Sequence, residues 1–358
     1  MSAVAERSTD AAPRWPGDGK DFRVTMGLHV CPPEVWLLPA AAAPDLLANK
    51  AAVLAAHHDD AFAVMPEGDA AAREAAHVLF THIATHDPDV GAAVPALLVA
   101  EADEQHPLER VGRLIAEDVC IMTPHAVGDA ASESAATAAA TAEYRLTAAL
   151  LCAPSRWSLR EKLGTSLQSI HGPVPGYGTI AAPTDRFFTR LPVGEIMERT
   201  NWSVLDSPTL FQPGFEHART GVFAHADADL VTGGSVGSVG SDRSAVSDGP
   251  AVSDGSVESA GSDGSNGSDG GTSRTSVLQR RWLRLERQTL RKLPQTGAVI
   301  FTILTTNTRL DELAARAPET ARQLAHKMRT APEATCVYKG WSDAALVADA
   351  LEAACLRL

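Results

Sequence analysis

Residues 233–276 constrain the fold more than any other part of this sequence, because they contain almost no large apolar side chain. The segment is rich in Gly, Ser and Asp, and it holds six acidic residues and two arginines. Such a composition cannot bury enough apolar surface to offset the entropy lost on ordering. We therefore predict a disordered insertion in a loop. Because each flanking stretch looks too short to fold alone, we predict one domain, residues 21–358, that this insertion interrupts.

The first 20 residues of the 358-residue chain are polar and have no apolar segment of the kind a secretory signal needs. We expect a disordered leader at residues 1–20. No run approaches the roughly 18 consecutive apolar residues of a membrane span, so we expect no membrane partner and a cytoplasmic location. The net charge of −13 argues against nucleic acid as a partner, since phosphate binding needs clustered Lys and Arg.

Five cysteines are scattered along the chain, and none forms a C-x-x-C pair: Cys31, Cys120, Cys152, Cys336 and Cys355. An odd, dispersed set argues against a disulfide framework and against a zinc or iron–sulfur site.

Hydrophobic periodicity and turn residues predict a mixture of helices and strands. We expect helices at Asp45–Ala61, Asp69–Thr85, Pro107–Met122, Leu310–Ala317, Glu319–Thr330 and Ser342–Leu356. We expect strands at Tyr144–Cys152, Asn201–Leu205, Trp282–Leu290 and Ala298–Thr305, with a loop or frayed helix at residues 126–142. The last two strands flank a turn with Pro and Gly and should form an antiparallel hairpin, which gives an α+β fold class.

A helix that starts at Ser158 has the clearest local signal in the chain. Ser158 and Glu161 have the spacing of a capping box, and Gly172 follows the expected end at Ile170 or His171. On one continuous helix, Leu163, Leu167 and His171 would share a face. The pattern therefore predicts an imidazole directed from the helix end into the apolar interior.

Five motifs occur in a fixed order along the chain. They are E-D-V-C at 117–120, P-S-R-W-S-L-R-E-K-L-G at 154–164, I-H-G-P-V-P at 170–175, N-W-S at 201–203 and E-R-Q-T-L-R-K-L-P-Q-T-G-A-V-I-F-T-I at 286–303. Together they resemble the haem-dependent oxidative N-demethylase family over residues 26–220 and 278–356.

This resemblance implies a PAS-like antiparallel sheet core with a haem pocket and added N-terminal and C-terminal helices. It also implies oxidative N-demethylation of a small secondary or tertiary amine, such as dimethylamine, with O2 at a b-type haem. The reductase functions of such systems use NADPH, flavin and a [2Fe–2S] cluster. This chain has no cysteine pattern for that cluster and no G-x-G-x-x-G after a strand, so we expect electrons from a separate reductase partner.

His171 is the expected haem ligand, because a haem iron needs a proximal side chain of this kind. His125 is the rival ligand, and a buried structural histidine is the alternative for either. Arg284, Arg287 and Arg291 lie on an expected strand, where they could bind the haem propionates. Alternation along the strand places Leu283, Leu285 and Arg287 on one face and Arg284, Glu286 and Gln288 on the other. A charged edge strand explains these arginines equally well.

Glu286 and Tyr177 are the expected catalytic residues. Glu286 could hold a cationic amine, and Glu117 and Asp118 could do the same, although a structural ion pair is favoured for these two. Tyr177, Trp157 and Trp202 could stack on the macrocycle or contact an alkylammonium, or they could be ordinary core aromatics. Arg156 and Lys162 flank the capping box and are expected to contact either a carboxylate of the protein or a propionate.

Two other functions remain open from the sequence. The chain could be a haem-binding sensor or carrier of the PAS type without turnover, since a fold does not fix a function. It could also be a haem-free interaction protein that kept the scaffold. The mechanism implied by the resemblance removes an N-methyl group as formaldehyde.

Overall fold

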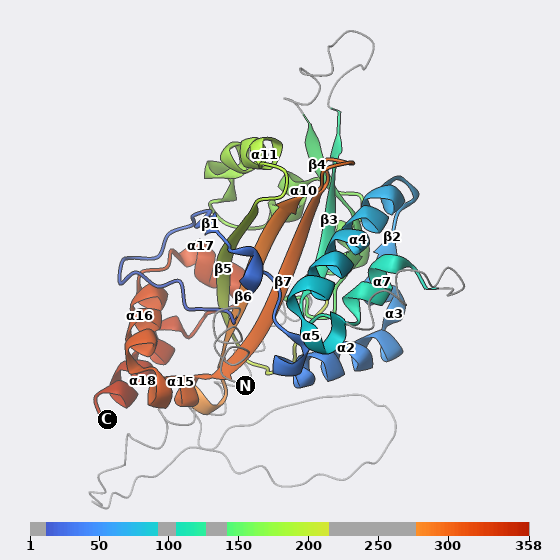
Figure 1. The fold of residues 1–358 in the computed structure, drawn as a ribbon. Helices are drawn as coiled ribbons and strands as arrows, with labels where there is room; N and C mark the ends of the chain where they lie inside the picture. Colours follow the sequence, from blue (N-terminus) through green and yellow to red (C-terminus); the bar gives the residue numbers. More distant parts are fainter. Residues whose placement is uncertain (1–11, 92–104, 127–141, 215–276, 358) are drawn as a thin grey trace, which may run out of the picture.

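The computed structural model describes residues 12–91, 105–126, 142–214 and 277–357 (Figure 1). The predicted insertion at 233–276 lies outside the described residues, as does almost all of the predicted loop at 126–142. Residues 12–20 of the expected leader are described. Within them, Trp15 donates an indole hydrogen bond to Gln323 Oε1 at 2.9 Å. Residues 12–20 therefore contact the folded part of the chain.

A seven-stranded antiparallel sheet lies at the centre of the described structure, in the order β1-β5-β6-β7-β3-β4-β2. The strands are β1 (His29–Val30), β2 (Phe62–Val64), β3 (Asp118–His125), β4 (Glu143–Leu150), β5 (Ile196–Leu205), β6 (Trp282–Lys292) and β7 (Val299–Arg309). Strands β5 and β6 pair from end to end, although residues 215–276 separate them in sequence. The predicted hairpin is confirmed as β6 and β7. The α+β class is confirmed, and the PAS-like character stays a prediction.

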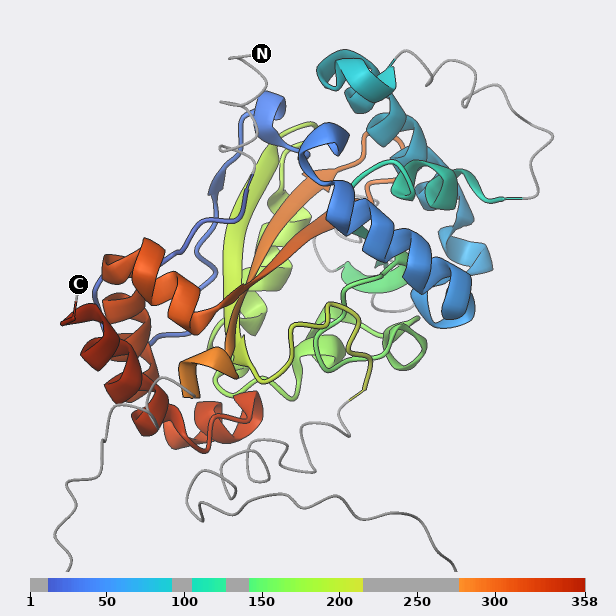
Figure 2. The ribbon, with the colours of Figure 1, turned by 90° about the horizontal axis from the view of Figure 1, so that it is seen from below.

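Helices surround the sheet on both faces and at one end (Figures 1 and 2). The helices that precede β3 in the chain are η1 (Pro33–Val35), η2 (Ala40–Ala42), α2 (Pro44–Ala56), α3 (His58–Ala61), η3 (Pro66–Gly68), α4 (Asp69–His86), α5 (Pro88–Gly91) and α7 (Pro107–Gly112). Between β4 and β5 lie α9 (Leu159–Lys162), α10 (Leu167–His171), η4 (Tyr177–Thr179) and α11 (Ala181–Arg190). After β7 come α15 (Leu310–Arg316), α16 (Pro318–Arg329), α17 (Glu333–Lys339) and α18 (Ala344–Cys355).

Alternation along the strands gives the sheet two distinct apolar faces. On one face Ile121 and Ile300 pack with the alanine-rich helix α4, whose small side chains allow close approach to the sheet. On the opposite face Cys120, Met122 and Leu290 belong to a second core. That second core also includes residues of the α9–α11 region: Leu159, Leu167 and Phe188. The side chains of the second face lie beside the cavity described below.

The C-terminal helices form a third core at one end of β5 and β6. Leu283 and Val204 from the strands pack against Leu324 of α16 and Leu351 of α18. The three C-terminal helices expected from the sequence are confirmed as α15, α16 and α18. Helix α17 was not expected, and its last residue, Lys339, reaches the cavity.

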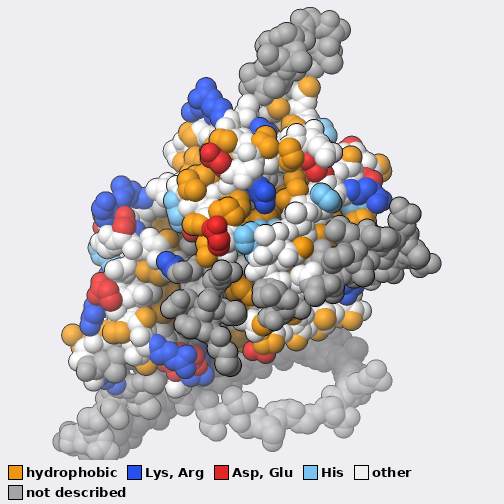
Figure 3. Space-filling model, viewed as in Figure 1, with side chains coloured by type: hydrophobic (Ala, Val, Ile, Leu, Met, Phe, Trp, Pro, Cys, Tyr) orange, Lys and Arg blue, Asp and Glu red, His pale blue; other side chains and the backbone are white. Residues whose placement is uncertain are grey.

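Charged side chains of both signs are interspersed on the face shown in Figure 3. The excess of acidic residues in the sequence is therefore not gathered into one patch on the described part of that face.

The predicted helix at Pro107–Met122 is wrong beyond Gly112. Helix α7 ends there, and residues from Asp118 onward form β3, which is paired on both sides by β4 and β7. Because β3 is central and buried on both faces, its apolar residues are contiguous, and this pattern resembles a buried helix. Gly112 itself lies so close to Leu150 that a Cβ atom would stand 2.7 Å from Leu150 Cδ1.

The continuous helix expected from Ser158 to His171 is also wrong. Ser158 makes no capping hydrogen bond with its side chain, and α9 ends at Lys162. Gly164 then takes a φ of +79°, a left-handed conformation that a helix cannot contain. Ser166 is the true N-cap of α10, where its hydroxyl accepts a hydrogen bond from the Ser169 amide at 3.2 Å. His171 consequently lies on a separate short helix.

Candidate functional site

A cavity of about 760 Å³ lies between the second face of the sheet and the α9–α11 region. This volume is within the range of about 300–1,000 Å³ that small-molecule and cofactor sites occupy. The sheet supplies an apolar floor through alternate residues of adjacent strands: Cys120, Met122, Leu146, Leu290, Phe301 and Ile303. A flat apolar ligand would therefore lie on side chains that the strand pattern turns to one face.

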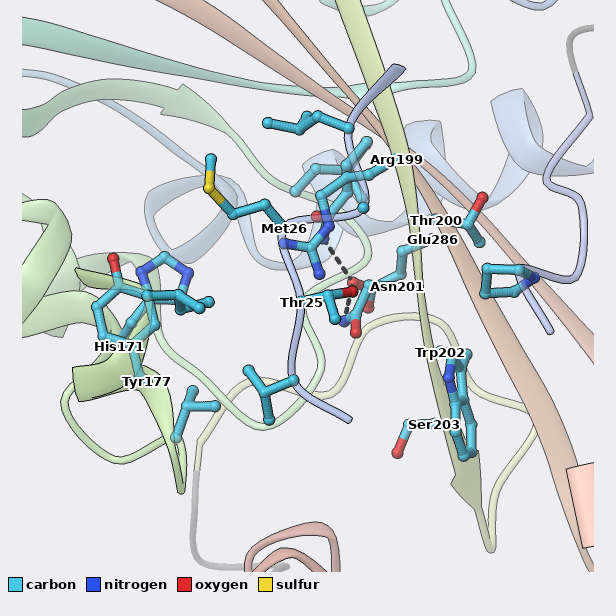
Figure 4. A pocket seen from close by; sticks show the side chains of 18 of the residues that line it. Thr25, Met26, His171, Tyr177, Arg199, Thr200, Asn201, Trp202, Ser203 and Glu286 are labelled. Atoms are coloured by element: carbon cyan, nitrogen blue, oxygen red, sulfur yellow. Dashed lines mark hydrogen bonds between the residues drawn. The ribbon is translucent and has the colours of Figure 1, made fainter. Parts of the chain in front are cut away.

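An extended N-terminal strap, residues 12–28, supplies another part of the cavity lining. Inward and outward residues alternate along it, and Phe22, Val24, Met26 and Leu28 are the ones that are partly buried in its second half. Figure 4 shows Thr25 and Met26 passing through the centre of the view, between His171 and Asn201. The first half of the strap binds α16, where Lys327 Nζ donates to Asp18 Oδ1 at 2.8 Å.

His171 lies on one wall of the cavity and is held in a defined orientation. Its Nδ1 is 2.9 Å from the carbonyl oxygen of Leu167, and its ring stacks on Tyr177 with centroids 4.8 Å apart. Burial lowers the pKa of His171, and Arg199 and Lys162 add to the lowering. A carbonyl can only accept, so the neutral imidazole carries its proton on Nδ1. Its Nε2 lone pair is then available to a metal.

Glu286 marks the polar end of the cavity, and neighbouring donors fix its carboxylate. Arg284 Nε donates to one oxygen at 2.8 Å, while Asn201 Nδ2 and Gln288 Nε2 donate to the other at 3.1 Å each. Burial acts to raise the pKa of Glu286, but Arg284 and the side-chain hydrogen bonds outweigh it and hold the pKa below its ordinary value. The carboxylate is therefore ionised at neutral pH.

Arg199 was missed by the sequence reasoning and lies inside the cavity. It sits on β5 opposite Gln288, on the same face as Asn201. Figure 4 shows its side chain reaching from β5 to a place between the His171–Tyr177 pair and Glu286. Its Nε is buried without a hydrogen bond, and burial lowers its pKa. The expected strand began only at Asn201; extending the alternation back by two residues would have found Arg199.

Three more cations line the cavity. Lys162 Nζ donates to the Ile170 carbonyl at 3.3 Å, and the Arg156 guanidinium donates to the Lys339 carbonyl. Arg156 has a φ of +62°, a backbone conformation that is rare for a residue other than glycine. Lys339 Nζ donates to the Trp202 carbonyl at 2.9 Å, and burial lowers its pKa to about 8. Within the described part of the chain, these three cationic groups have no carboxylate within salt-bridge distance.

The aromatic residues expected at the site have different surroundings. Trp157 lines the cavity and packs against its apolar core. Trp202 also lines it, but its ring stacks on Trp341 at 5.2 Å and is met by Trp15 at 5.1 Å and Phe22 at 6.0 Å. Lys339 Nζ lies 5.5 Å from the centroid of the same ring. A protein cation already holds a position at Trp202 where an alkylammonium could bind.

The arginines expected on β6 do not share the cavity. Arg287 projects to the opposite face, where it donates to the Trp36 carbonyl at 2.8 Å and forms an ion pair with Glu198. Part of Arg287 still contributes to the cavity lining. Arg291 also lies on the opposite face, 4.7 Å above the Trp36 ring. Arg284 is on the cavity face but is buried behind Glu286 and is not part of the lining.

The remaining candidates lie away from the cavity. His125 is at the end of β3, where its Nε2 is 3.0 Å from Thr123 Oγ1, and it is not part of the lining. Glu117 and Asp118 are buried beside Lys50, which donates to the Glu117 carbonyl at 2.5 Å and lies 4.0 Å from Asp118 Oδ1. These contacts favour a structural role for the two acids over amine binding.

A metal site built from side chains alone and a membrane-spanning helix are both absent from the described ranges. No three His, Cys, Asp or Glu side chains there come close enough to hold a metal ion by themselves. None of the helices in those ranges combines the length and apolar character that a membrane span needs.

Comparison with known protein families agrees with the motif order. The family model described as "Haem-dependent oxidative N-demethylase, alpha subunit-like" matches residues 27–236 and 245–347, which is most of the chain. No curated protein matches the chain.

Proposed function

Because the chain belongs to the haem-dependent oxidative N-demethylase alpha subunit-like family, we propose that it binds a b-type haem in the cavity beside His171 and demethylates a small secondary or tertiary amine. The observation that carries this proposal is the orientation of His171. Its Nδ1 proton is committed to the Leu167 carbonyl, and its Nε2 is left as a ligand at the wall of a large apolar cavity.

The donor set of the cavity fits a haem. A haem combines an apolar ring, an iron that takes an axial ligand from the protein, and two carboxylates. The sheet floor supplies apolar contacts, His171 supplies a neutral imidazole, and Arg156 and Lys162 supply cations whose hydrogen bonds go to backbone carbonyls. Charge-assisted hydrogen bonds to carboxylates are among the stronger interactions available to such cations.

Bound haem would supply the O2-dependent oxidation, in which an N-methyl amine, O2, two electrons and two protons give the demethylated amine, formaldehyde and water. The chain's own residues position the reactants. The stacked ring of Tyr177 fixes the plane of His171, and the apolar floor excludes water from the reacting methyl group. Glu286 offers an ionised carboxylate at the polar end, where it would orient the nitrogen of the amine.

We assign electron delivery to a separate reductase that carries NADPH, flavin and [2Fe–2S] sites. All five cysteines of this chain are free, and four of them are buried at separate places in the fold. This distribution offers no set of thiolates for an iron–sulfur cluster within the described residues.

The first test is the absorption spectrum of the purified protein with added hemin, oxidised and dithionite-reduced, for wild type, His171→Ala and His125→Ala. We expect a Soret band in wild type and in His125→Ala, and a lost or shifted band in His171→Ala. A wild-type protein without a Soret band would contradict the proposal. A band that is lost only in His125→Ala would identify His125, at the end of β3, as the haem ligand.

Turnover separates an enzyme from a haem-binding sensor or carrier. Wild-type protein with haem, a ferredoxin-type reductase system, NADPH and an N-methylated amine should form formaldehyde in proportion to the NADPH consumed. Haem binding without formaldehyde from any amine would leave the sensor or carrier function instead.

A further inference from the structure

The polar end of the cavity holds more positive than negative charge. Glu286 is the carboxylate there, and Arg284 already neutralises it through a 2.8 Å ion pair. Arg199 and Lys339 both interact electrostatically with Glu286, and neither has a carboxylate within salt-bridge distance in the described structure. A simple alkylammonium would therefore enter a region that is cationic overall, which is unfavourable for it.

Arg199 is the group in this region that most needs an anion. Its guanidinium projects into the cavity, and its Nε is buried without a hydrogen bond. A buried N–H donor without a hydrogen bond is destabilising, and a carboxylate that binds a guanidinium side-on satisfies two N–H donors at once. A ligand carboxylate would satisfy Arg199, whereas an amine would not.

The strand register places the backbones of Arg199 and Glu286 at a suitable separation. Asn201 stands opposite Glu286, and Arg199 stands opposite Gln288, on the same face of the sheet. The two cross-strand rows are therefore two residues apart, which corresponds to roughly 7 Å along a strand. A molecule with an ammonium and a carboxylate separated by one carbon can span this gap with a hydrogen bond at each end.

We propose that the substrate is an N-methylated amino acid, whose carboxylate binds Arg199 and whose methylated nitrogen binds Glu286. This substrate class rests on the proposed function and refines it. For N-methylglycine the reaction balances with the electrons of the reductase: N-methylglycine, O2, two electrons and two protons give glycine, formaldehyde and water. The carbon–nitrogen bond to the methyl group breaks, and the nitrogen keeps the electron pair.

A haem propionate is the other carboxylate that Arg199 could bind, and the experiment distinguishes the two. Calorimetric titration of the protein, with and without haem, uses N-methylglycine, dimethylamine and N-methylethylamine, the last being similar in length but without the carboxylate. The variants are Arg199→Gln and Arg199→Lys. Arg186→Gln, an exposed arginine on α11, is the matched control.

We expect wild type to bind N-methylglycine at least tenfold more tightly than either amine, as an order of magnitude for one charge-assisted contact. Arg199→Gln should lower the affinity for N-methylglycine by about 10- to 100-fold. It should leave the haem content unchanged, and it should raise the affinity for dimethylamine, because it removes a repulsive charge near Glu286. Arg199→Lys should recover part of the loss, and Arg186→Gln should match wild type.

Two results would overturn the proposal, and a third would separate it from the proposed function. Equal affinity of wild type for N-methylglycine and N-methylethylamine would overturn the proposal. Loss of haem in Arg199→Gln with unchanged N-methylglycine affinity would also overturn it and assign Arg199 to a propionate. Arg199-dependent binding of N-methylglycine to a protein that takes up no haem would support the site while contradicting the proposed function.

Discussion

The imidazole of His171 and the phenol ring of Tyr177 lie nearly parallel, with centroids 4.8 Å apart and planes at 13°. The two residues come from α10 and η4, which the turn at residues 172–176 joins. Gly176 in this turn has a φ of +79°, which favours glycine. The turn therefore lays the tyrosine ring against the imidazole, and the Leu167 carbonyl fixes the rotation of the imidazole.

Tyr177→Leu should weaken haem binding because it removes the stacked ring and leaves His171 held by one hydrogen bond. An aromatic pair contributes about 0.5–1.5 kcal/mol, so the haem dissociation constant should rise roughly two- to tenfold. Tyr177→Phe keeps the ring and should bind haem as wild type does. Hemin titration followed at the Soret band measures both, and equal weakening in the two variants would argue for the hydroxyl in place of the stack.

The elements predicted correctly from the sequence are those whose signals are local. The β6–β7 hairpin has a Pro-Gly turn between two strands, and α16 begins at Pro318 and ends with basic residues. The strand β3 was missed because a central strand buried on both faces shows no alternation. Its residues then fit helical spacing by coincidence, and only the pairing with β4 and β7 decides between the two structures.

The lining of the candidate site was predicted only in part, because a strand pattern separates two faces without saying which one meets the cavity. The cavity lining includes most of the expected site residues, namely His171, Tyr177, Glu286, Arg156, Trp157, Lys162, Trp202 and Arg287. Alternation on β6 correctly separated Arg287 from Glu286, but it could not tell which of the two faces would meet the cavity. That choice depends on the α9–α11 region and the strap, which are distant in sequence.

His82 should make the protein less stable in acid. Burial lowers the pKa of His82 to about 3, and His86 and Arg291 add to the lowering. The unfolded state, with a pKa near 6.5, binds the proton more strongly, so stability is complete above pH 6.5 and falls as the pH drops toward 3. Between pH 6.5 and 4 the loss attributable to this residue is about 3 kcal/mol at most.

His82→Phe should flatten this acid dependence, because phenylalanine cannot take up a proton and can keep the edge-to-face contact with Trp36. His77→Phe, at an exposed position on the same helix, is the control and should keep the wild-type slope. Urea unfolding at several pH values measures the free energy of unfolding for each. Parallel slopes in wild type and His82→Phe would contradict the prediction.

Lys339 should make the protein more stable as the pH rises on the alkaline side. Burial lowers its pKa to about 8, with Arg156 and Arg199 contributing, while Glu286 opposes the shift. The unfolded lysine, near 10.5, binds more protons between pH 8 and 10.5, so the contribution of this residue makes stability rise with pH in that window. Lys339→Met should remove this rise, and Lys20→Met, at an exposed position, should not. The free energy of unfolding at pH 7.5, 9 and 10 decides between them.

Arg156 and Lys162 should matter for haem retention, and Arg291 should not, because the sheet separates them. The first two line the cavity, whereas Arg291 lies over Trp36 on the opposite face. We expect Arg156→Gln and Lys162→Met each to raise the haem dissociation constant about tenfold, the value of one charge-assisted contact to a propionate.

Arg291→Gln is the matched control for these two variants, since it removes an arginine from the strand where a propionate contact was first expected. Its haem dissociation constant should equal that of wild type, while its thermal midpoint should fall slightly from the lost contact with Trp36. Transfer of haem to apomyoglobin measures retention independently of turnover. Faster transfer from Arg291→Gln than from Arg156→Gln would mean that the haem contacts the opposite face of the sheet, where α4 now packs.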